Sequence, residues 1–511
     1  MTIDNRVVDT SCGPVLGIID GRVRAWKGIR YAAAPVGDLR FRAPQPPEPW
    51  TEVADATSFG PACPQPSLPN IPIDLGAPQG EDCLRLNIWA PSDTQPGDRK
   101  PVLVWLHGGA YILGSGSQSL YDGRALAGDG GVVVVTINYR IGALGFVDLS
   151  SFDARFDSNI GLRDVLAALG WVRDNISAFG GDPERVTLFG ESAGAGIVTT
   201  LLGVPAAAGL FAGAIAQSSP ATSVYDRDSA QRVATAVLEE LELTASEVQR
   251  LRDVPAAAIV TAANDVFNEV PVRNPGRLAL VPIVDGELLS DYPVKLAQQG
   301  RTHPVPLIIG TNKHEATLFR LMKSPLMPIT PSAITSMFTQ IAAEQPDLQL
   351  PTQEQIVLAY PRMRRKSRGI SIATDVGFRM PSVWLAEGHG LVAPVYLYRF
   401  DYSTPLLKLL LVRAAHATEL PYVWGNLGAP KDPTLKLGGA KTAKAISHRV
   451  RTRWINFASA GKPQGPAGEP EWTPYQETDR ACLTINKRDT IVHDLDSHIR
   501  AAWGAEMVGF R

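Results

Sequence analysis

The chain has 511 residues, of which 45% are hydrophobic and 20% are charged, and its formal net charge at pH 7 is -2. This composition is typical of a globular protein with a sizeable core and excludes a disordered chain. The charge balance excludes a broad basic surface for nucleic acid or an anionic membrane, so we expect a small, mostly uncharged molecule as the partner.

No targeting or membrane segment is visible. The first residues, MTIDNRVVDTSCGPVLG, contain no basic stretch followed by an apolar run, so we predict no secretory signal and a cytoplasmic location. The valine run at 131–135 is far shorter than the roughly 18 residues of a membrane span. The four cysteines form no CxxC pair, so neither a metal centre nor redox chemistry is expected.

Strand-like and helix-like segments alternate in the first half of the chain. The apolar runs PVLVWLHGG (101–109), GVVVVTINYR (131–140) and RVTLFGESAG (185–194) are each typical of a strand. Between the last two, residues 160–176 carry apolar side chains at helical spacing, and Gly180–Gly181 is a stop signal. This order predicts an α/β fold with a mostly parallel sheet covered by helices on both faces.

The second half adds further strands and two helical regions. Apolar runs at 305–311 and 394–402 predict more strands, whereas 228–270 and 321–390 are predicted to be helical insertions or a cap. No long linker divides the chain, so a single domain over 1–511 is expected. The basic run at 362–368 has no aromatic or glycine-rich partner, and we interpret it as a solvated face.

One serine has the setting of a nucleophile. Ser192 lies in Gly190–Glu191–Ser192–Ala193–Gly194, directly after a predicted strand and before a stretch that can start a helix. The GxSxG pattern alone is weak, but on a sharp strand-to-helix turn it raises the hydroxyl above the sheet. The context therefore indicates acyl transfer at Ser192.

A second glycine pair supplies candidate donors for an oxyanion. Gly108 and Gly109 follow a predicted strand in HGGAY, and their backbone N–H groups could converge with that of Ala193. His107 precedes these donors and lies upstream of the serine, so we interpret it as a structural hydrogen-bonding residue.

We expect the acid and the base to follow the serine in the chain, because this is their order in α/β-hydrolases. Among the late histidines, His416 lies among small residues, whereas His448, His493 and His498 lie among charged ones. For the acid, Glu315 after one strand, Asp401 after another and, less well placed, Asp375 all remain open from position alone.

Several long segments resemble the type-B carboxylesterase family, most closely its bacterial para-nitrobenzyl esterase branch. The likeness is carried by FGGDPERVTLFGESAG, by EDCLRLNIWAP at 81–91, by NYRIGALGF and by HATELPYVWGN, and it covers nearly the whole chain. The resemblance implies an α/β-hydrolase fold with a large, mixed, mostly parallel sheet.

The resemblance also implies the roles of individual residues. It places the nucleophile on Ser192, the acid on Glu315 rather than Asp401, and the base on His416. It implies an oxyanion hole at Gly108, Gly109 and Ala193, and it places Glu191 and Ser218 where they would steady the histidine. Cys63 and Cys83 match a pair that is bonded in secreted members, but we expect a cytosolic chain to keep both thiols reduced.

These residues imply hydrolysis of carboxylic esters through an acyl-serine intermediate, without a metal or a cofactor. Residues 63–83 contain no aromatic side chain for a choline-binding wall, so small to medium uncharged apolar esters are expected. Two interpretations of the apolar segment at 405–412 stay open: a lining of the pocket mouth, or a packed helix or subunit contact. A lipase acting on longer acyl chains is the alternative function, and a non-catalytic binding protein is a third class that the intact serine disfavours.

Overall fold

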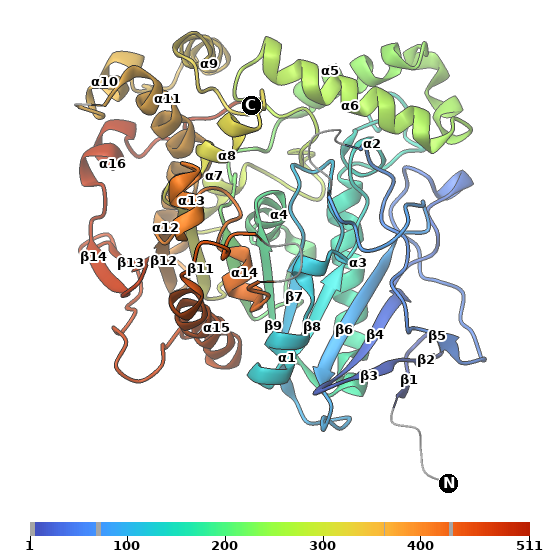
Figure 1. Cartoon of the computed structure of the whole chain (residues 1–511). Coiled ribbons are helices and arrows are strands. Elements are labelled where there is room, and N and C mark those ends of the chain that lie inside the picture. Colours follow the sequence, from blue (N-terminus) through green and yellow to red (C-terminus); the bar gives the residue numbers. More distant parts are fainter. Residues whose placement is uncertain (1–5, 68–72, 362, 429–432) are drawn as a thin grey trace.

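A single large sheet organises the molecule. The computed structural model describes residues 6–67, 73–361, 363–428 and 433–511. Eleven strands form the sheet in the order β14-β13-β12-β11-β10-β9-β7-β8-β6-β4-β3 (Figure 1). The strands are β3 (Ile18–Asp20), β4 (Val23–Arg30), β6 (Arg85–Pro91), β7 (Lys100–Leu106), β8 (Val133–Ile137), β9 (Gly181–Glu191), β10 (Gly213–Gln217), β11 (Leu307–Asn312), β12 (Val395–Phe400), β13 (Ala481–Ile485) and β14 (Thr490–His493).

The sheet is mixed and mostly parallel. All neighbouring pairs from β13 across to β8 are parallel, whereas β14 at one edge and β6, β4 and β3 at the other pair antiparallel. A small separate sheet joins β1 (Val7–Asp9), β2 (Pro14–Leu16) and β5 (Ala54–Asp55). The prediction of a large, mixed, mostly parallel sheet is therefore confirmed.

Successive side chains of the central strands pack into two separate hydrophobic cores. In β7, Val102, Val104 and Leu106 join one buried cluster, and Leu103 and Trp105 join the other. Because successive side chains of a strand point to opposite faces, a strand buried on both sides must be apolar throughout. This explains why the sequence of β7 is a continuous hydrophobic run.

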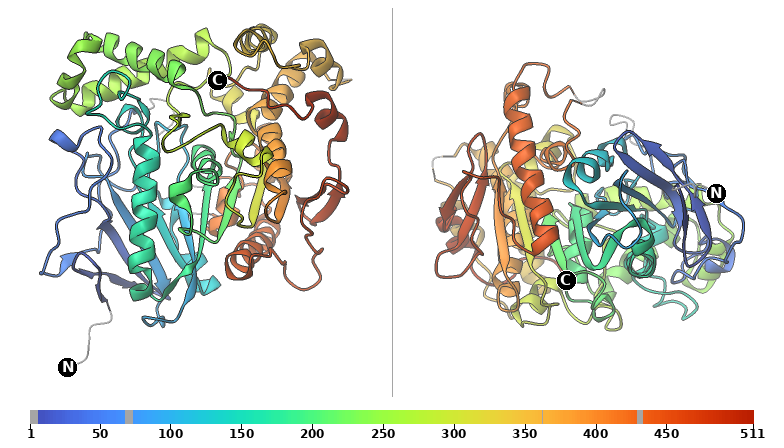
Figure 2. Two further views of the ribbon diagram at one scale, coloured as in Figure 1. Left: turned by 180° about the vertical axis from the view of Figure 1, so that it is seen from behind. Right: turned by 90° about the horizontal axis from the view of Figure 1, so that it is seen from below.

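Helices cover both faces of the sheet. The helix α3 (Ile160–Asn175) supplies apolar residues to the first core, and α15 (Ala440–Ala460) supplies them to the second (Figure 2). Further helices beside the sheet are α1 (Arg124–Gly130), α4 (Ala193–Leu201), α7 (Pro293–Gln298) and α12 (Met380–His389). The other helices of these layers are α2 (Ala143–Phe146), α8 (Ala316–Leu321), α13 (Pro405–Leu409), α14 (Leu420–Trp424) and α16 (Ser497–Trp503).

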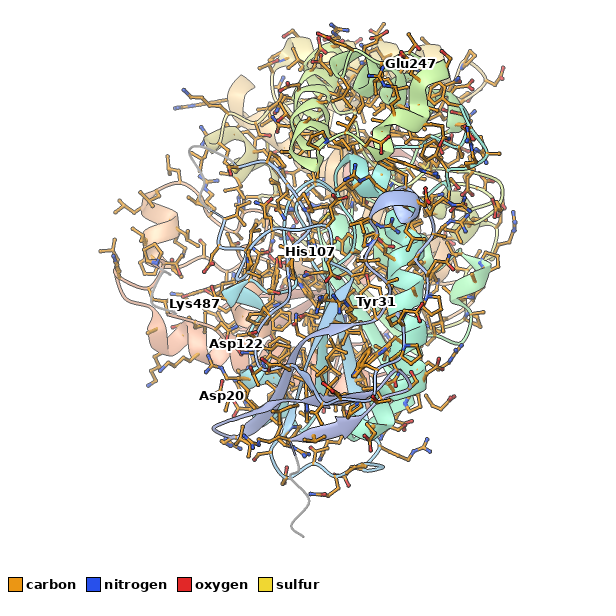
Figure 3. All side chains as sticks on the ribbon, turned by 90° about the vertical axis from the view of Figure 1, so that its right-hand side faces the viewer. Asp20, Tyr31, His107, Asp122, Glu247 and Lys487 are labelled. Carbon is orange, nitrogen blue, oxygen red and sulfur yellow. The ribbon has the colours of Figure 1, made fainter. Side chains whose placement is uncertain are left out.

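The regions 228–270 and 321–390 contain mostly helices. Residues 228–270 form α5 (Arg227–Glu240), a 3₁₀ segment (Ala245–Arg252) and α6 (Ala256–Arg273), which lie beyond one end of the strands (Figure 1). Residues 321–390 contain α9 (Pro331–Glu344), α10 (Gln353–Leu358), α11 (Arg365–Thr374), a π-helical turn (Asp375–Arg379) and α12. In a side view, His107 lies deep inside the molecule, whereas Glu247 lies among these outer helices (Figure 3).

Candidate active site

Ser192 occupies a tight turn between β9 and α4. Its backbone has φ 56° and ψ -124°, a left-handed conformation that costs energy for a residue with a side chain. A Cβ added at Gly190 would lie 2.6 Å from the carbonyl carbon of Gly194, and one at Gly194 would lie 2.1 Å from Leu106 O. The two glycines therefore allow the strand and the helix to approach closely while the Ser192 side chain stays partly exposed.

The loop after β7 lies against this turn. A Cβ on Gly108 would lie 2.8 Å from Glu191 O and 3.1 Å from the Ser192 Cβ, so this position leaves no room for a side chain. Gly109, Ala110 and Tyr111 follow with φ values of 121°, 53° and 63°. Ala110 and Tyr111 are strained at these positive φ values, whereas Gly109 adopts its conformation without strain.

Three backbone N–H groups near Ser192 have no partner. Within the described part of the chain, the amides of Gly108, Gly109 and Ala193 donate no hydrogen bond. The first amides of a helix are normally free, but buried backbone donors elsewhere are nearly always paired. The sequence predicted these three residues as donors. In the structure Gly108 lies against Ser192, Gly109 follows Gly108, and Ala193 follows Ser192.

His107 supports this loop. Its buried ring stacks on Tyr139 with 4.5 Å between centroids, and Nδ1 lies 3.0 Å from Gly108 O. Burial lowers the pKa of His107 to about 4, so the ring is neutral at pH 7. The Tyr139 hydroxyl donates to His107 O at 2.6 Å. The structural role predicted for His107 agrees with these contacts.

His416 and Glu315 form a buried pair. The imidazole Nδ1 lies 2.7 Å from Glu315 Oε2, and the Glu315 side chain is fully buried. The other carboxylate oxygen accepts from the Ser218 hydroxyl at 2.6 Å and from the backbone N–H of Asn312 at 2.5 Å. A carboxylate that accepts these bonds is fixed in position and orients the imidazole ring.

Glu191 approaches the opposite edge of the imidazole. Its Oε1 lies 3.1 Å from His416 Nε2 without hydrogen-bond geometry, and that oxygen has no other partner in the described chain. The Ser192 hydroxyl likewise makes no hydrogen bond within the described residues. Catalytic hydrogen bonds are often loose without substrate, so this geometry is compatible with proton transfer once an ester is bound.

Three buried carboxyl groups set the titration of His416. Burial raises the pKa of Glu191 to about 8, an effect that His416 opposes and that Glu419 and Glu315 reinforce. Burial lowers the pKa of His416, but the negative charges of Glu191 and Glu315 outweigh the effect of burial. The pKa of His416 is therefore raised to about 9. Because each group responds to the charge of the other, Glu191 and His416 titrate as a pair.

The pocket above Ser192 is apolar. It encloses about 500 Å³, part of it open to solvent, and its walls include Tyr111, Pro220, Leu278, Phe319 and Phe378 beside Ser192. The rings of Phe378 and Phe319 lie 4.6 and 5.2 Å from that of His416. The walls therefore favour an uncharged ligand, and two aromatic rings restrict the position of the imidazole.

The other candidate acids and bases lie elsewhere. Asp401 pairs with Arg399 at 2.7 Å and with Lys313 at 3.1 Å. Asp375 pairs with Arg379 at 2.8 Å and contacts the Tyr360 hydroxyl. The remaining late histidines, His448, His493 and His498, are exposed. Of the open alternatives, only Glu315 contacts His416.

Some residues of the site were not identified from the sequence. Glu419 is buried, and the side chains of Gln217 and Asn312 donate to its carboxylate. Burial raises the pKa of Glu419, and Glu315 adds to that effect. Its position three residues after His416 was a usable signal. Phe378 lies in a segment interpreted only as helical cover, and Phe319 lies between the predicted strand at 305–311 and that segment.

The apolar segment 405–412 and the basic run 362–368 both carry exposed residues. Leu409, Leu410 and Leu411 are more than half exposed, and no residue of 405–412 lines the pocket that contains Ser192. Of the two open interpretations, the lining of the pocket mouth therefore finds no support in the structure, because the leucines at 409–411 are exposed. In the basic run 362–368, residues 363, 364 and 367 are exposed, and residue 362 lies outside the described residues.

The described part of the chain contains free cysteines but no arrangement typical of a metal site or of a membrane span. Cys63 and Cys83 are buried free thiols, and the neighbouring Cys63 together with burial raises the pKa of Cys83. Among the residues with described positions, no group of histidine, cysteine and acidic side chains has the arrangement of a metal site. No described helix is both long and apolar enough to cross a membrane.

The chain is similar to known esterases over nearly its whole length. The model of the carboxylesterase family matches residues 4–503. The para-nitrobenzyl esterase of Bacillus subtilis is 41% identical over 97% of this chain and 98% of its own, and mouse carboxylesterase 1E is 34% identical over 92% and 88%. A solved para-nitrobenzyl esterase structure covers 98% of the chain, with 40% identity and a TM-score of 0.84, and matches over its full length. A Geobacillus stearothermophilus carboxylesterase gives 36% identity and a TM-score of 0.85 at the same coverage of this chain.

Proposed function

The chain belongs to the carboxylesterase family and hydrolyses carboxylic esters, and we propose that it does so with Ser192 as nucleophile, His416 as base and Glu315 as acid. The observation that carries this proposal is the 2.7 Å contact between His416 and Glu315 beside a serine on a strained strand-to-helix turn. Glu191 and Ser218 are positioning residues in the same proposal.

The reaction follows from the chemistry of these groups. His416 accepts the Ser192 proton as the hydroxyl oxygen attacks the ester carbonyl, and the charge on the carbonyl oxygen is stabilised by the N–H groups of Gly108, Gly109 and Ala193. Glu315 stabilises the imidazolium that forms. His416 then protonates the leaving alcohol, and the same histidine activates a water molecule that releases the acid from Ser192.

We propose small to medium, uncharged apolar esters as substrates. The support is the apolar pocket wall, which offers no charged side chain to a ligand. A lipase-like preference for longer acyl chains is the alternative. Rates on monomeric and emulsified esters of the same acid distinguish the two, since a lipase gains activity when an oil–water interface forms.

An active-site probe tests the nucleophile. An organophosphonate should add once to the wild-type chain, as seen by intact-mass spectrometry, and should not add to Ser192→Ala. The variant should also lose kcat by about 10⁵- to 10⁶-fold. An adduct that persists in Ser192→Ala would refute the assignment.

We further propose a single domain over 1–511 and a reducing, cytoplasmic location. The first is supported by one sheet that takes strands from Ile18–Asp20 to Thr490–His493, and a single unfolding transition is expected. The second is supported by the free thiols of Cys63 and Cys83. Thiol titration of the denatured chain isolated from its cells should then give four free groups.

A further inference from the structure

Two sets of hydrogen bonds hold the segment that carries Glu315. This segment, residues 313–316, lies between the end of β11 and the first turn of α8. In the first set, the amides of its first two residues donate to Phe400 O at 3.0 Å and to Ala414 O at 2.9 Å. These bonds attach the segment to β12 and to the loop that leads to His416.

The second set comes from the end of α11 and the π-helical turn that follows it. Helices α8 and α11 pack together there (Figure 1). The Ala316 N–H donates to the Thr374 hydroxyl at 3.1 Å, and the Arg379 guanidinium donates to Lys313 O at 3.3 Å. The segment is therefore bonded at both ends to one short stretch of chain, residues 374–379.

The bond to Thr374 satisfies a buried amide at the start of a helix. Ala316 is the first residue of α8, and the first N–H groups of a helix have no partner within it. Glu315 occupies the cap position, but its side chain accepts no bond from this helix and contacts His416 instead. Ala316 and Thr374 are 0% and 2% exposed, so water cannot replace the hydroxyl. Because a buried donor without a partner is costly, this bond fixes the point at which α8 begins.

One peptide unit joins the acid, the base and Thr374. In the peptide between Glu315 and Ala316, the carbonyl oxygen accepts from the His416 N–H at 3.4 Å, and the N–H donates to Thr374. A peptide unit is planar and rigid, so the two bonds together fix the direction in which the Glu315 side chain leaves the backbone. A rotation of this unit would move the carboxylate away from the imidazole Nδ1, which it now contacts at 2.7 Å.

The stretch 374–379 also contacts the imidazole ring. The ring of Phe378 lies 4.6 Å from that of His416. The stretch is held in turn by ion pairs of Arg379, which lies 2.8 Å from the buried Asp375 and 3.3 Å from Asp496. A π-helical turn is rare and often lies at a functional site. One fixed element therefore contacts both the backbone beside the acid and the ring of the base.

We propose that Thr374 and Arg379 are positioning residues for the reaction, which hold the Glu315 carboxylate against His416 through the backbone of residues 313–316. The inference rests on the proposed function and deepens it. Neither residue lines the pocket that contains Ser192, so both act through Glu315 and not on the ester.

Thr374→Val tests the inference, because it keeps the shape of the side chain and removes the oxygen. The kcat for a para-nitrophenyl ester should fall about tenfold or more, and KM should stay within about twofold, since the pocket walls are unchanged. Thr374→Ser restores the oxygen and should return kcat to within about threefold of wild type.

The pH profile reports the same displacement independently. Three buried carboxyl groups, those of Glu191, Glu315 and Glu419, face His416 and raise its pKa. When Glu315 moves away, the pKa of His416 falls, so the ascending limb of kcat/KM in Thr374→Val should move about half a unit to lower pH. A change that only loosens the fold lowers the melting temperature and leaves this limb in place.

A double-mutant cycle shows whether Thr374 acts through Glu315. In a chain that already carries Glu315→Gln, adding Thr374→Val should change kcat by less than about twofold, because the charge to be positioned is gone. Thr302→Val is the matched control. Its buried hydroxyl contacts His389 Nδ1 at 2.8 Å, outside the site, so kcat should stay within about twofold and the pH limb should not move.

Each outcome decides. If Thr374→Val does not fold, Arg379→Lys keeps the positive charge but removes the planar guanidinium, and it should lower kcat and move the limb in the same direction. An unchanged kcat and limb in the variant that folds, an equal loss in Thr302→Val, or an undiminished loss in the Glu315→Gln background would overturn the inference. Full activity in Glu315→Gln alone would refute the proposed acid instead.

Discussion

Polar residues lie on one side of Ser192, and mainly apolar residues lie on the other. On the side of the base, Glu315 and His416 lie 2.7 Å apart and are held by polar contacts with Ser218 and Asn312 at the ends of strands. On the other side, Phe319, Met327 and Phe378 line an apolar pocket. In the proposed mechanism, proton transfer therefore lies on the rigid strand ends, and substrate fit lies on the helical region.

The largest effect should come from the rigid side. Glu315→Gln keeps the size of the side chain but removes the charge that stabilises the imidazolium, so kcat should fall about 10⁴-fold. Steady-state hydrolysis of a para-nitrophenyl ester measures it. Asp401→Asn is the matched control, because Asp401 pairs with Arg399 instead. A greater loss in the control than in Glu315→Gln would move the acid to Asp401.

Gly108→Ala should have the next largest effect. The added methyl group would lie 2.8 Å from Glu191 O, so the loop must shift and the amides of Gly108 and Gly109 leave the oxyanion. Loss of one such donor costs about 10²- to 10³-fold in kcat. Gly170→Ala in α3, where nothing lies within 4 Å, is the control and should leave kcat unchanged. Equal rates in the two variants would contradict the oxyanion hole.

A smaller effect concerns pH. The Glu191 carboxylate raises the pKa of His416, and the base must be neutral to accept a proton, so activity increases as the pH rises through that pKa. Glu191→Gln removes this charge and should move the ascending limb of kcat/KM about one unit to lower pH. The full pH profile of both proteins decides. A limb that stays in place or moves to higher pH would show that Glu191 does not act on His416.

The smallest effect is expected for the exposed leucines at the end of α13 and just after it. Changing both Leu409 and Leu410 to serine should leave the ratio of long-chain to acetate hydrolysis within about twofold, since neither lines the pocket. The rates on para-nitrophenyl esters from acetate to dodecanoate measure this ratio. A selective loss on long chains would return these leucines to the substrate path and weaken the contrast between the two sides.

The sequence predicted the rigid side well because local rules determine it. The strand-to-helix turn at Ser192 needs glycines at fixed offsets, and the central strands need continuous apolar runs, so both are visible in the residue order. The predicted strand at 131–140 was longer than β8 (Val133–Ile137), because the following residues turn away toward α2.

The pocket walls could not be predicted in the same way. Phe319, Met327 and Phe378 are separated in sequence from Ser192 by well over a hundred residues, and ordinary helical patterns surround them. Their proximity depends on how the helices from α8 to α12 pack over the strand ends, which no local pattern specifies. From position alone, the choice among Glu315, Asp401 and Asp375 was open for the same reason. The family resemblance favoured Glu315, and the contact with His416 supports that choice.

The left-handed backbone at Ser192 lowers the stability of the fold at the position that carries the proposed nucleophile. A glycine at this position would adopt the same turn without strain and would be expected to make the fold more stable by about 1 kcal/mol, but it would lack the hydroxyl that we propose attacks the ester. The chain with its serine therefore holds a less stable conformation and keeps that oxygen. Any variant selected only for heat resistance would come under pressure to lose the reaction.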